Sequence, residues 1–224
     1  MVALTVTTGV VEAVSFLVLG PVFTAMQTGN LLLLGFAITG QGGLSVAASS
    51  ASLGGFAVGA VLGARFESSI DSWGRRWFVV ALLVESILLG LAGALAWEID
   101  GAGEPLSGRH YAVTAVVASA MGMRNVTTLR ARVPDLPTTL ATRAMTAFLG
   151  VSPPALDPKL RAGAKGEGRR AASVGAMFTG GIFGAWLLRE AVRPPVVLLV
   201  AAAGVLITGI VYGSMSRSRA PTPG

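Results

Sequence analysis

Long apolar blocks with few charged residues constrain this chain more than any other feature of its sequence. Blocks such as 79–97 and 196–212 approach the ~20 apolar residues that a helix needs to cross a ~30 Å hydrocarbon core. Of all 224 residues, 53% are hydrophobic and 12% are charged, whereas soluble domains carry roughly 25% charged residues. Because too few charged side chains remain to cover a soluble fold of this size, the sequence predicts an all-α, polytopic membrane protein.

Composition and charge exclude several other classes of function. The formal net charge is +6, but the basic residues lie between the apolar blocks, where lipid head groups are better partners than nucleic acid. Cysteine is absent and His110 is the single histidine, which excludes thiolate or histidine-rich metal sites and a Ser-His-Asp triad. We therefore expect no nucleic-acid partner, metal, cofactor or enzymatic activity. An apolar N-terminus that contains Glu12 and no basic region is not expected to be a cleaved signal peptide.

Two of the hydrophobic regions are too long to be single straight helices across a membrane. Six regions can be drawn within one transmembrane domain over residues 1–224: 4–39, 46–65, 76–97, 110–150, 171–188 and 194–213. A continuous helix over the first would reach ~54 Å at ~1.5 Å per residue, well beyond the hydrocarbon core. Proline removes a backbone donor and clashes with the preceding turn. Gly20-Pro21 in the first region, and Pro134 and Pro137 in the fourth, therefore predict broken helices.

A stripe of glycines occurs at corresponding places in the two halves of the chain. The spacing that begins at Gly54 recurs from Gly175, at an offset of 121 residues. Small residues at every fourth position let membrane helices approach each other closely. The residues expected at helix–helix contacts are Gly55, Gly59, Gly63, Gly180 and Gly184. Gly93 belongs to no stripe and is expected to face lipid.

The broken regions also correspond. Gly9-x2-Glu12 parallels Gly122-x2-Asn125, and Thr28 parallels Thr142 after a gap of one residue. The order of a broken region, a glycine-striped span and an ordinary span thus occurs twice. We interpret this order as an internal duplication, with repeat one over 1–100 and repeat two over 108–215.

The distribution of Lys and Arg favours one membrane crossing for each broken region. With three spans in each half, the segments 65–76, 151–170 and 215–224 share a side and hold ten basic residues, against three on the opposite side. Full hairpins at both breaks would divide the basic residues eight to seven. Only the first count follows the positive-inside rule. It predicts six spans, with both termini and the basic loop 151–170 in the cytoplasm. Because each half crosses the membrane an odd number of times, the two copies have opposite orientations and form an inverted repeat, as in many secondary transporters.

Two motifs resemble a known family. GVVEAVSFLVLGPVFTAMQTGNLLLLG and ASAMGMRNVTTLRARVPDLPTTLATRAMT are similar to the two signatures of the YoaK-like bacterial membrane proteins, a domain of unknown function. The resemblance covers essentially the whole chain and implies a small multi-span protein of the bacterial inner membrane, but no substrate. The chain departs from the family pattern where Glu12 replaces aspartate, Gln27 replaces methionine, Arg124 replaces glutamine and Arg143 replaces glycine.

The segment Thr28-Gly29-Asn30 follows the first break and has two interpretations. As a functional site, its amide and hydroxyl groups would coordinate a solute or ion in mid-membrane. As a structural feature, Gly29 would allow close packing, and Asn30 would satisfy backbone groups freed by the break. The corresponding Thr142 favours the functional interpretation, because binding sites lie at repeat interfaces.

Charged residues within the apolar regions are the other candidates, because a membrane buries charge only at a cost. Glu12 and Glu85 are candidates for proton or ion coupling, with a structural pairing role as the alternative. Arg124, next to Asn125, requires an anionic partner if it is buried. Glu12 is its pseudo-symmetric candidate, and an anionic solute is the other. We expect Glu12, Arg124 and Asn125 to line a polar cavity between the two breaks, the second of which contains Thr138-Thr139.

These observations predict a small transporter or permease of unknown solute. A scaffold or interaction protein that packs through its glycine faces is the alternative from a different class. The expected partners are the lipid bilayer, a small-molecule or ionic solute and a second copy of the chain. The candidate solute-binding residues are Glu12, Thr28, Gly29, Asn30, Arg124, Asn125 and Thr142.

Overall fold

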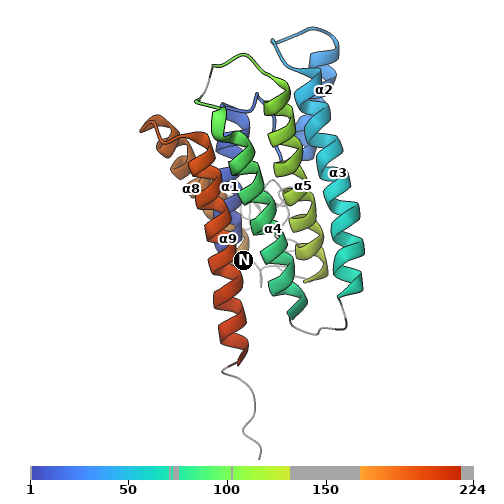
Figure 1. Cartoon of the computed structure of the whole chain (residues 1–224), viewed down its shortest axis with the longest axis vertical. Coiled ribbons are helices and arrows are strands. Elements are labelled where there is room, and N and C mark those ends of the chain that lie inside the picture. Colours follow the sequence, from blue (N-terminus) through green and yellow to red (C-terminus); the bar gives the residue numbers. More distant parts are fainter. Residues whose placement is uncertain (1, 71, 73–75, 102, 132–166, 218–224) are drawn as a thin grey trace, which may run out of the picture.

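The fold is a bundle of helices, seen in a computed structural model that describes residues 2–70, 72, 76–101, 103–131 and 167–217 (Figure 1). No strand occurs in this part of the chain. The helices are α1 (Val2–Leu17), α2 (Gln27–Ile38), α3 (Val46–Ser69), α4 (Arg76–Leu95) with the short 3-10 helix η2 (Ala96–Glu98), α5 (Gly108–Arg130), α8 (Glu167–Arg189) and α9 (Pro194–Arg217).

Length and hydropathy make several of these helices candidate membrane spans. Among the described residues, four segments are long and apolar enough to cross a bilayer: Val46–Ser69, Arg76–Glu98, Ala171–Arg189 and Pro194–Met215. Helices α1 and α2 are apolar but have only 16 and 12 residues. Many large apolar side chains point outward, such as Leu31, Ile38 and Phe178. A soluble monomer rarely exposes so much apolar surface, so the chain is a helical membrane protein.

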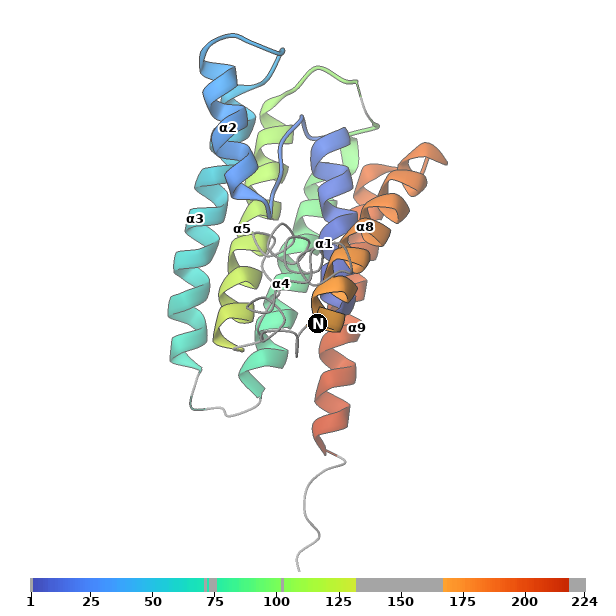
Figure 2. The same cartoon turned by 180° about the vertical axis from the view of Figure 1, so that it is seen from behind.

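The first hydrophobic region is broken, as the sequence predicts. Helix α1 ends at Leu17, and Gly20 adopts a φ of +115°, a left-handed conformation that favours glycine. Figures 1 and 2 show that the non-helical segment 18–26 then runs back into the bundle, and α2 returns to the end of the molecule where α1 finishes. Leu19, Val22 and Thr24 are buried, so the break lies within protein and not against lipid. The second predicted break, with Pro134, Pro137 and Thr138-Thr139, lies outside the described residues.

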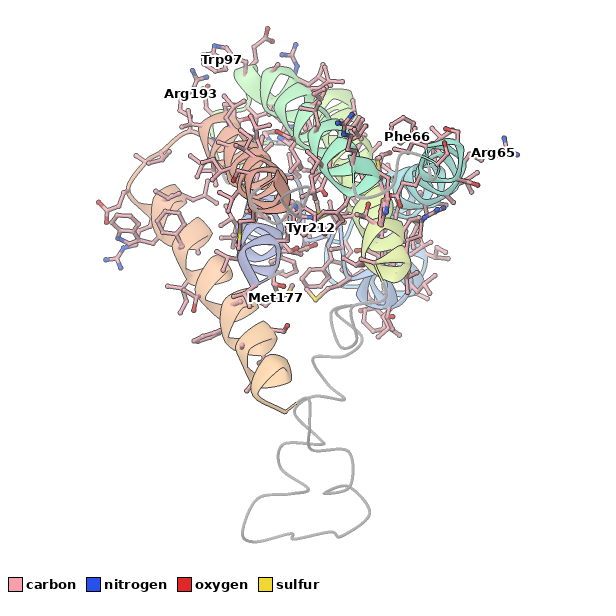
Figure 3. The ribbon with its side chains drawn as sticks, turned by 90° about the horizontal axis from the view of Figure 1, so that it is seen from below. Arg65, Phe66, Trp97, Met177, Arg193 and Tyr212 are labelled. Carbon is pink, nitrogen blue, oxygen red and sulfur yellow. The ribbon has the colours of Figure 1, made fainter. Side chains whose placement is uncertain are left out.

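Each long helix packs against specific partners far away in sequence. Helix α1 packs on α8 and α9, α5 packs on α3 and α4, and α4 packs on α9. Helix α2 contacts α3. Viewed along the bundle, α8 lies at the periphery beside α1 (Figure 3). The buried core, which includes Val14, Leu82, Leu89, Val117 and Val205, joins α1, α4, α5 and α9.

Glycines bring α3 and α5 into close contact. A Cβ on Gly59 would lie only 2.5 Å from Ser119 Cα, and one on Gly55 would lie 2.8 Å from Ala115 Cα. At Gly63 the nearest atom would be Met123 Cγ at 3.0 Å. A side chain at Gly55 or Gly59 would therefore overlap the backbone of α5.

The contact between α1 and α8 is built in the same way. A Cβ on Gly180 would lie 3.0 Å from Val6 Cα, and one on Gly184 would lie 2.8 Å from Ala13 Cβ. Gly54 and Gly175, by contrast, face open space. The expectation that Gly93 faces lipid is wrong, because a Cβ there would lie 3.1 Å from the Leu199 side chain of α9. Gly93 is buried because α4 packs on α9. The spacing of glycines in the sequence does not predict this contact.

Polar side chains fix the ends of two long helices. Ser45 precedes α3, and its side chain accepts a hydrogen bond of 3.1 Å from the amide of Ala48. Ser107 precedes α5 and forms a capping box with His110, whose Nδ1 accepts from the Ser107 amide at 3.2 Å. Such caps satisfy amides that have no partner within the helix. The single histidine therefore contributes to a helix cap.

Candidate functional site

Glu12 is buried beside the break in the first region. Its side chain lies on α1 and is 6% exposed. The carboxylate accepts hydrogen bonds from the amide of Thr24 at 3.0 and 3.2 Å, from the hydroxyl of Thr24 at 3.2 Å and from the amide of Ala25 at 2.5 Å. The turn at Gly20 carries these donors back to α1. Glu12 therefore ties the segment just before α2 to the centre of the bundle.

Asn30 holds the same segment from its other side. Its Oδ1 accepts from the Phe23 amide at 2.9 Å, and its Nδ2 donates to the Phe23 carbonyl and, at 2.9 Å, to Ser52 Oγ of α3. Ser52 also donates to the Phe23 carbonyl at 2.6 Å, and Gln27 Nε2 donates to the Thr24 carbonyl at 2.7 Å. Backbone groups freed by the break thus find side-chain partners, as a membrane interior requires.

The residues around Asn30 do not all contribute to this network. Thr28 is exposed, and it lies on a different face of α2 from the buried Asn30. A Cβ on Gly29 would lie 2.9 Å from the Phe23 ring, so glycine makes room for that ring. Thr142, the expected counterpart of Thr28, lies outside the described residues.

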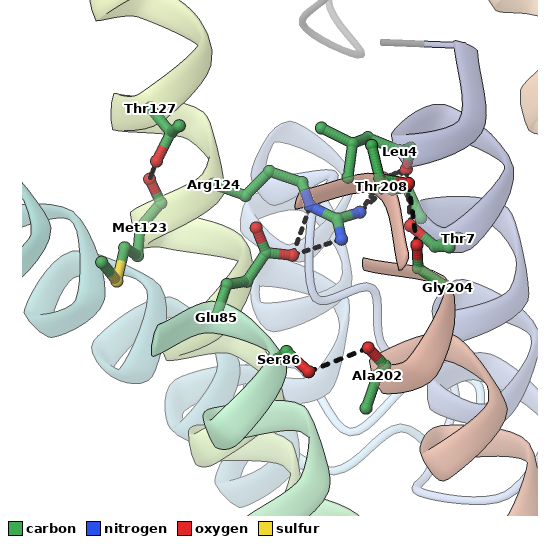
Figure 4. A network of polar contacts seen from close by, with 11 residues as sticks. Leu4, Thr7, Glu85, Ser86, Met123, Arg124, Thr127, Ala202, Gly204 and Thr208 are labelled. Carbon is green, nitrogen blue, oxygen red and sulfur yellow. Dashed lines mark hydrogen bonds and ion pairs between the residues drawn. The ribbon is translucent and has the colours of Figure 1, made fainter. Parts of the chain in front are cut away.

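Arg124 forms a second buried polar site, between α1, α4 and α5 (Figure 4). Its Nε donates to Glu85 Oε1 at 2.6 Å, and Nη2 forms an ion pair with the same oxygen. Nη1 donates to the Leu4 carbonyl at 2.9 Å and to Thr8 Oγ1 at 2.7 Å. Glu85 is 1% exposed and Arg124 is 6% exposed. The guanidinium therefore joins three helices inside the bundle.

The partner of Arg124 is Glu85, so the hypothesis that Glu12 pairs with Arg124 is wrong. Glu85 lies near the middle of α4, which packs directly on α5. Glu12 instead faces the break, which folds back against α1. Asn125, the neighbour of Arg124, is only partly buried on α5. The structure therefore separates residues that the sequence analysis grouped into one cavity.

A third buried carboxylate, Glu67, was missed by the sequence analysis. It is fully buried near the end of α3, where Oε1 accepts from Thr127 Oγ1 at 2.5 Å and Oε2 lies 3.7 Å from Arg130 Nε. Arg130 also lies over the Trp77 ring, at 5.6 Å from its centroid. The available signal was spacing: Glu67 follows Gly63 by four residues and so continues the glycine stripe that faces α5.

The three buried carboxylates differ in what balances their charge. Glu85 pairs with Arg124 and Glu67 with Arg130. Among the residues that the structure describes, no cationic side chain pairs with Glu12, whose partners are backbone amides and one hydroxyl. Of these three carboxylates, Glu12 is therefore the one whose partners in the described part of the chain are neutral donors.

Other charged pairs lie at the end of the bundle where α5 and α9 begin. Arg109 contacts Glu98 at 2.6 Å, and Arg193 contacts Asp100 at 3.0 Å while lying over the Trp97 ring. Trp97 and Arg193 are seen together in Figure 3. These side chains are largely exposed, so the two ion pairs connect chain segments at the surface.

A mostly apolar cavity of about 350 Å³ lies near Asp100, between the ends of α1 and α8.

Comparison with known protein families identifies the family of this chain. The family described as "Protein of unknown function (DUF1275)" matches residues 1–211. The chain belongs to this family. The match confirms the resemblance carried by the two motifs, and it extends over both halves of the bundle. Comparisons with curated proteins and with solved structures give no match. For this DUF1275 protein, a functional hypothesis must therefore come from the buried polar sites.

Proposed function

We propose that this protein is a small, non-enzymatic transporter or permease of the bacterial inner membrane, with its solute path next to the break at Glu12. The observation that carries the proposal is the burial of Glu12 beside an unwound segment inside a membrane bundle. Ionisable side chains at such depth are expensive and commonly mark substrate or ion paths. Irregular backbone at membrane depth is tolerated where it is buried in protein or lines a path.

The helix contacts support an inverted repeat. Let α1, α3 and α4 be the first, second and third spans of repeat one, and let α5, α8 and α9 be those of repeat two. The first span of each repeat then packs on the second span of the other, as α1 on α8 and α5 on α3. It also packs on the third span of the other repeat, as α1 on α9 and α5 on α4. Exchanging the repeats leaves this contact pattern unchanged, as a pseudo-two-fold axis would.

The ends of the helices support a cytoplasmic location for both termini. Helix α3 ends, α4 begins and α9 ends at one end of the bundle (Figure 1), close in sequence to Arg65 and Arg76. Helices α5 and α9 begin at the opposite end, near Arg109 and Arg193. Reporter fusions after residues 165 and 224 should both give cytoplasmic activity. A periplasmic signal from either fusion would overturn the six-span arrangement.

Buried charge also favours transport over a scaffold role. Replacement of buried ion pairs by well-packed apolar residues is often neutral or stabilising. Glu85 and Glu67 are paired with Arg124 and Arg130, whereas Glu12 is buried without a cationic partner among the described residues. The burial of Glu12 in an apolar bundle is better explained by a task that needs an ionisable group.

The proposal is tested by ligand binding followed by transport. Purified protein is screened by thermal shift against metabolites and ions, and each hit is assayed for uptake into proteoliposomes. Uptake should differ from that of the wild type in Glu12→Gln, because the side chain beside the solute path loses its charge. It should persist in the control Glu98→Gln, which alters an exposed carboxylate at the surface. If no compound shifts the melting temperature and none is taken up, the protein is a scaffold.

A further inference from the structure

We infer that the amides of Thr24 and Ala25 form a binding site for a compact monovalent anion, which the Glu12 carboxylate fills in this conformation. This inference rests on the proposed function, because it assigns a class of solute to the same site. Its first support is that the site already holds a carboxyl group by hydrogen-bond donors. Two backbone amides and the Thr24 hydroxyl converge on one carboxylate at 2.5–3.2 Å.

Within the part of the chain that the structure describes, the donors around Glu12 are neutral groups. Among the described residues, Arg124 pairs with Glu85 and Arg130 pairs with Glu67, and no ion pair joins Glu12 to a cationic side chain. The carboxylate is 6% exposed, so water contributes little to holding it. Oriented backbone amides are known to form anion-binding concavities. Hydrogen bonds to an ionised acceptor are about twice as strong as neutral ones.

The donors are held in position by groups other than Glu12. The carbonyl of Phe23 accepts from Ser52 at 2.6 Å, and its amide donates to Asn30 Oδ1 at 2.9 Å. The carbonyl of Thr24 accepts from Gln27 at 2.7 Å. These contacts orient the backbone on both sides of the Thr24 amide. The anion site should therefore persist when the Glu12 side chain is removed or displaced.

An anion of the size of a carboxylate or a halide fits this arrangement. The contacts come from three donors clustered along two residues, so they match one compact charged group and not an extended one. Because the Glu12 carboxylate occupies the donors, an entering anion must displace it. Glu12 would thus act as a tethered competitor that closes the site when no solute is bound.

Chemical rescue provides a direct test. Glu12→Ala removes the atoms equivalent to acetate and retains Cβ, so free acetate can supply the missing fragment. We expect acetate to raise the melting temperature of Glu12→Ala in a saturable manner and to leave the wild type unchanged. Chloride at the same ionic strength tests whether a halide can substitute for a carboxylate. Acetamide matches acetate in shape without its charge, and gluconate supplies a carboxylate on a larger molecule; neither should rescue.

A cavity control separates anion binding from general stabilisation by salt. Leu19→Ala empties a buried apolar position close to the break, and acetate should not raise its melting temperature. If Glu12→Ala does not fold, it is purified in acetate and in gluconate, and recovery of monodisperse protein only in acetate supports the site. Equal behaviour in both salts, or equal shifts in Glu12→Ala and Leu19→Ala, would overturn the inference.

The result can be separated from the test of transport. Rescue depends on equilibrium binding to purified protein and needs no flux. A protein that transports a hit but shows no rescue remains a transporter without this anion site. Rescue without any detected flux keeps the anion site and removes the claim of transport.

Discussion

Glu12 and Glu85 are both buried in the same bundle, yet they are held in opposite ways. Glu85 pairs with the guanidinium of Arg124, whereas Glu12 is surrounded by backbone amides. A buried ion pair joins two rigid helices, so its loss leaves an uncompensated charge between them. An amide site on an unwound segment can exchange one anion for another. The difference suggests that Glu85 maintains the bundle and Glu12 lies where the solute binds.

The largest expected effect comes from breaking the ion pair. Glu85→Gln or Arg124→Gln should each lower the free energy of unfolding by about 3–5 kcal/mol, because one buried charge loses its partner. The double variant should be more stable than either single one, as measured by chemical denaturation in detergent. The exposed pair Glu98 and Arg109 is the matched control, where the same changes should cost about 0–1 kcal/mol. Additive losses for Glu85 and Arg124 would show that the two residues do not depend on each other.

A somewhat smaller effect is expected at the glycine contacts that position each carboxylate. Gly59→Leu should separate α5, which carries Arg124, from α3, and Gly180→Leu should separate α8 from α1, which carries Glu12. Overpacking of this kind typically costs about 1–3 kcal/mol, seen as a lower melting temperature. Gly54→Leu is the control, because a Cβ there meets nothing within 4 Å. Equal losses at Gly54 and Gly59 would remove the special role of the stripe.

These contacts show how much of the fold could be predicted from sequence. Apolar blocks and glycine spacing depend on local sequence, so they identified a membrane bundle, the break at Gly20 and the helix faces around Gly59 and Gly180. The burial of Gly93 depends on which helix packs on α4. Sequence spacing alone does not specify such a partner.

The candidate site could be predicted only in part, for a related physical reason. Glu12, Glu85 and Arg124 stood out because charge is costly in an apolar segment. Their pairing depends on the direction of each side chain and on the reversal of the chain after α1. Pseudo-symmetry pointed to Glu12 as the partner of Arg124, whereas the packing of α4 on α5 brought Glu85 there. Glu67 was overlooked because it lies at a helix end, where an acidic residue looks solvated.

Asn30 tests whether the segment beside Glu12 is held in advance. Asn30→Ala removes the two hydrogen bonds that the Asn30 side chain makes with the backbone amide and carbonyl of Phe23. The free energy of unfolding should fall by about 1–3 kcal/mol, because these backbone groups lose a partner. Thr28→Ala, two residues earlier at an exposed position, should change stability by less than about 0.5 kcal/mol. Thermal melts of both variants provide the comparison. If the two changes have the same effect, Asn30 does not orient the amides around Glu12.

The smallest expected effect concerns the hydroxyl of Thr24. Thr24→Ala removes the hydroxyl donor at 3.2 Å from Glu12 but keeps the amides of Thr24 and Ala25. The loss should be about 0.5–1.5 kcal/mol, the net value of one hydrogen bond, and Thr24→Ser should restore most of it. In the Glu12→Ala background, acetate should still raise the melting temperature after Thr24→Ala, with a weaker apparent affinity. Complete loss of rescue would mean that the hydroxyl holds the anion, and the backbone amides would then no longer explain how Glu12 differs from Glu85.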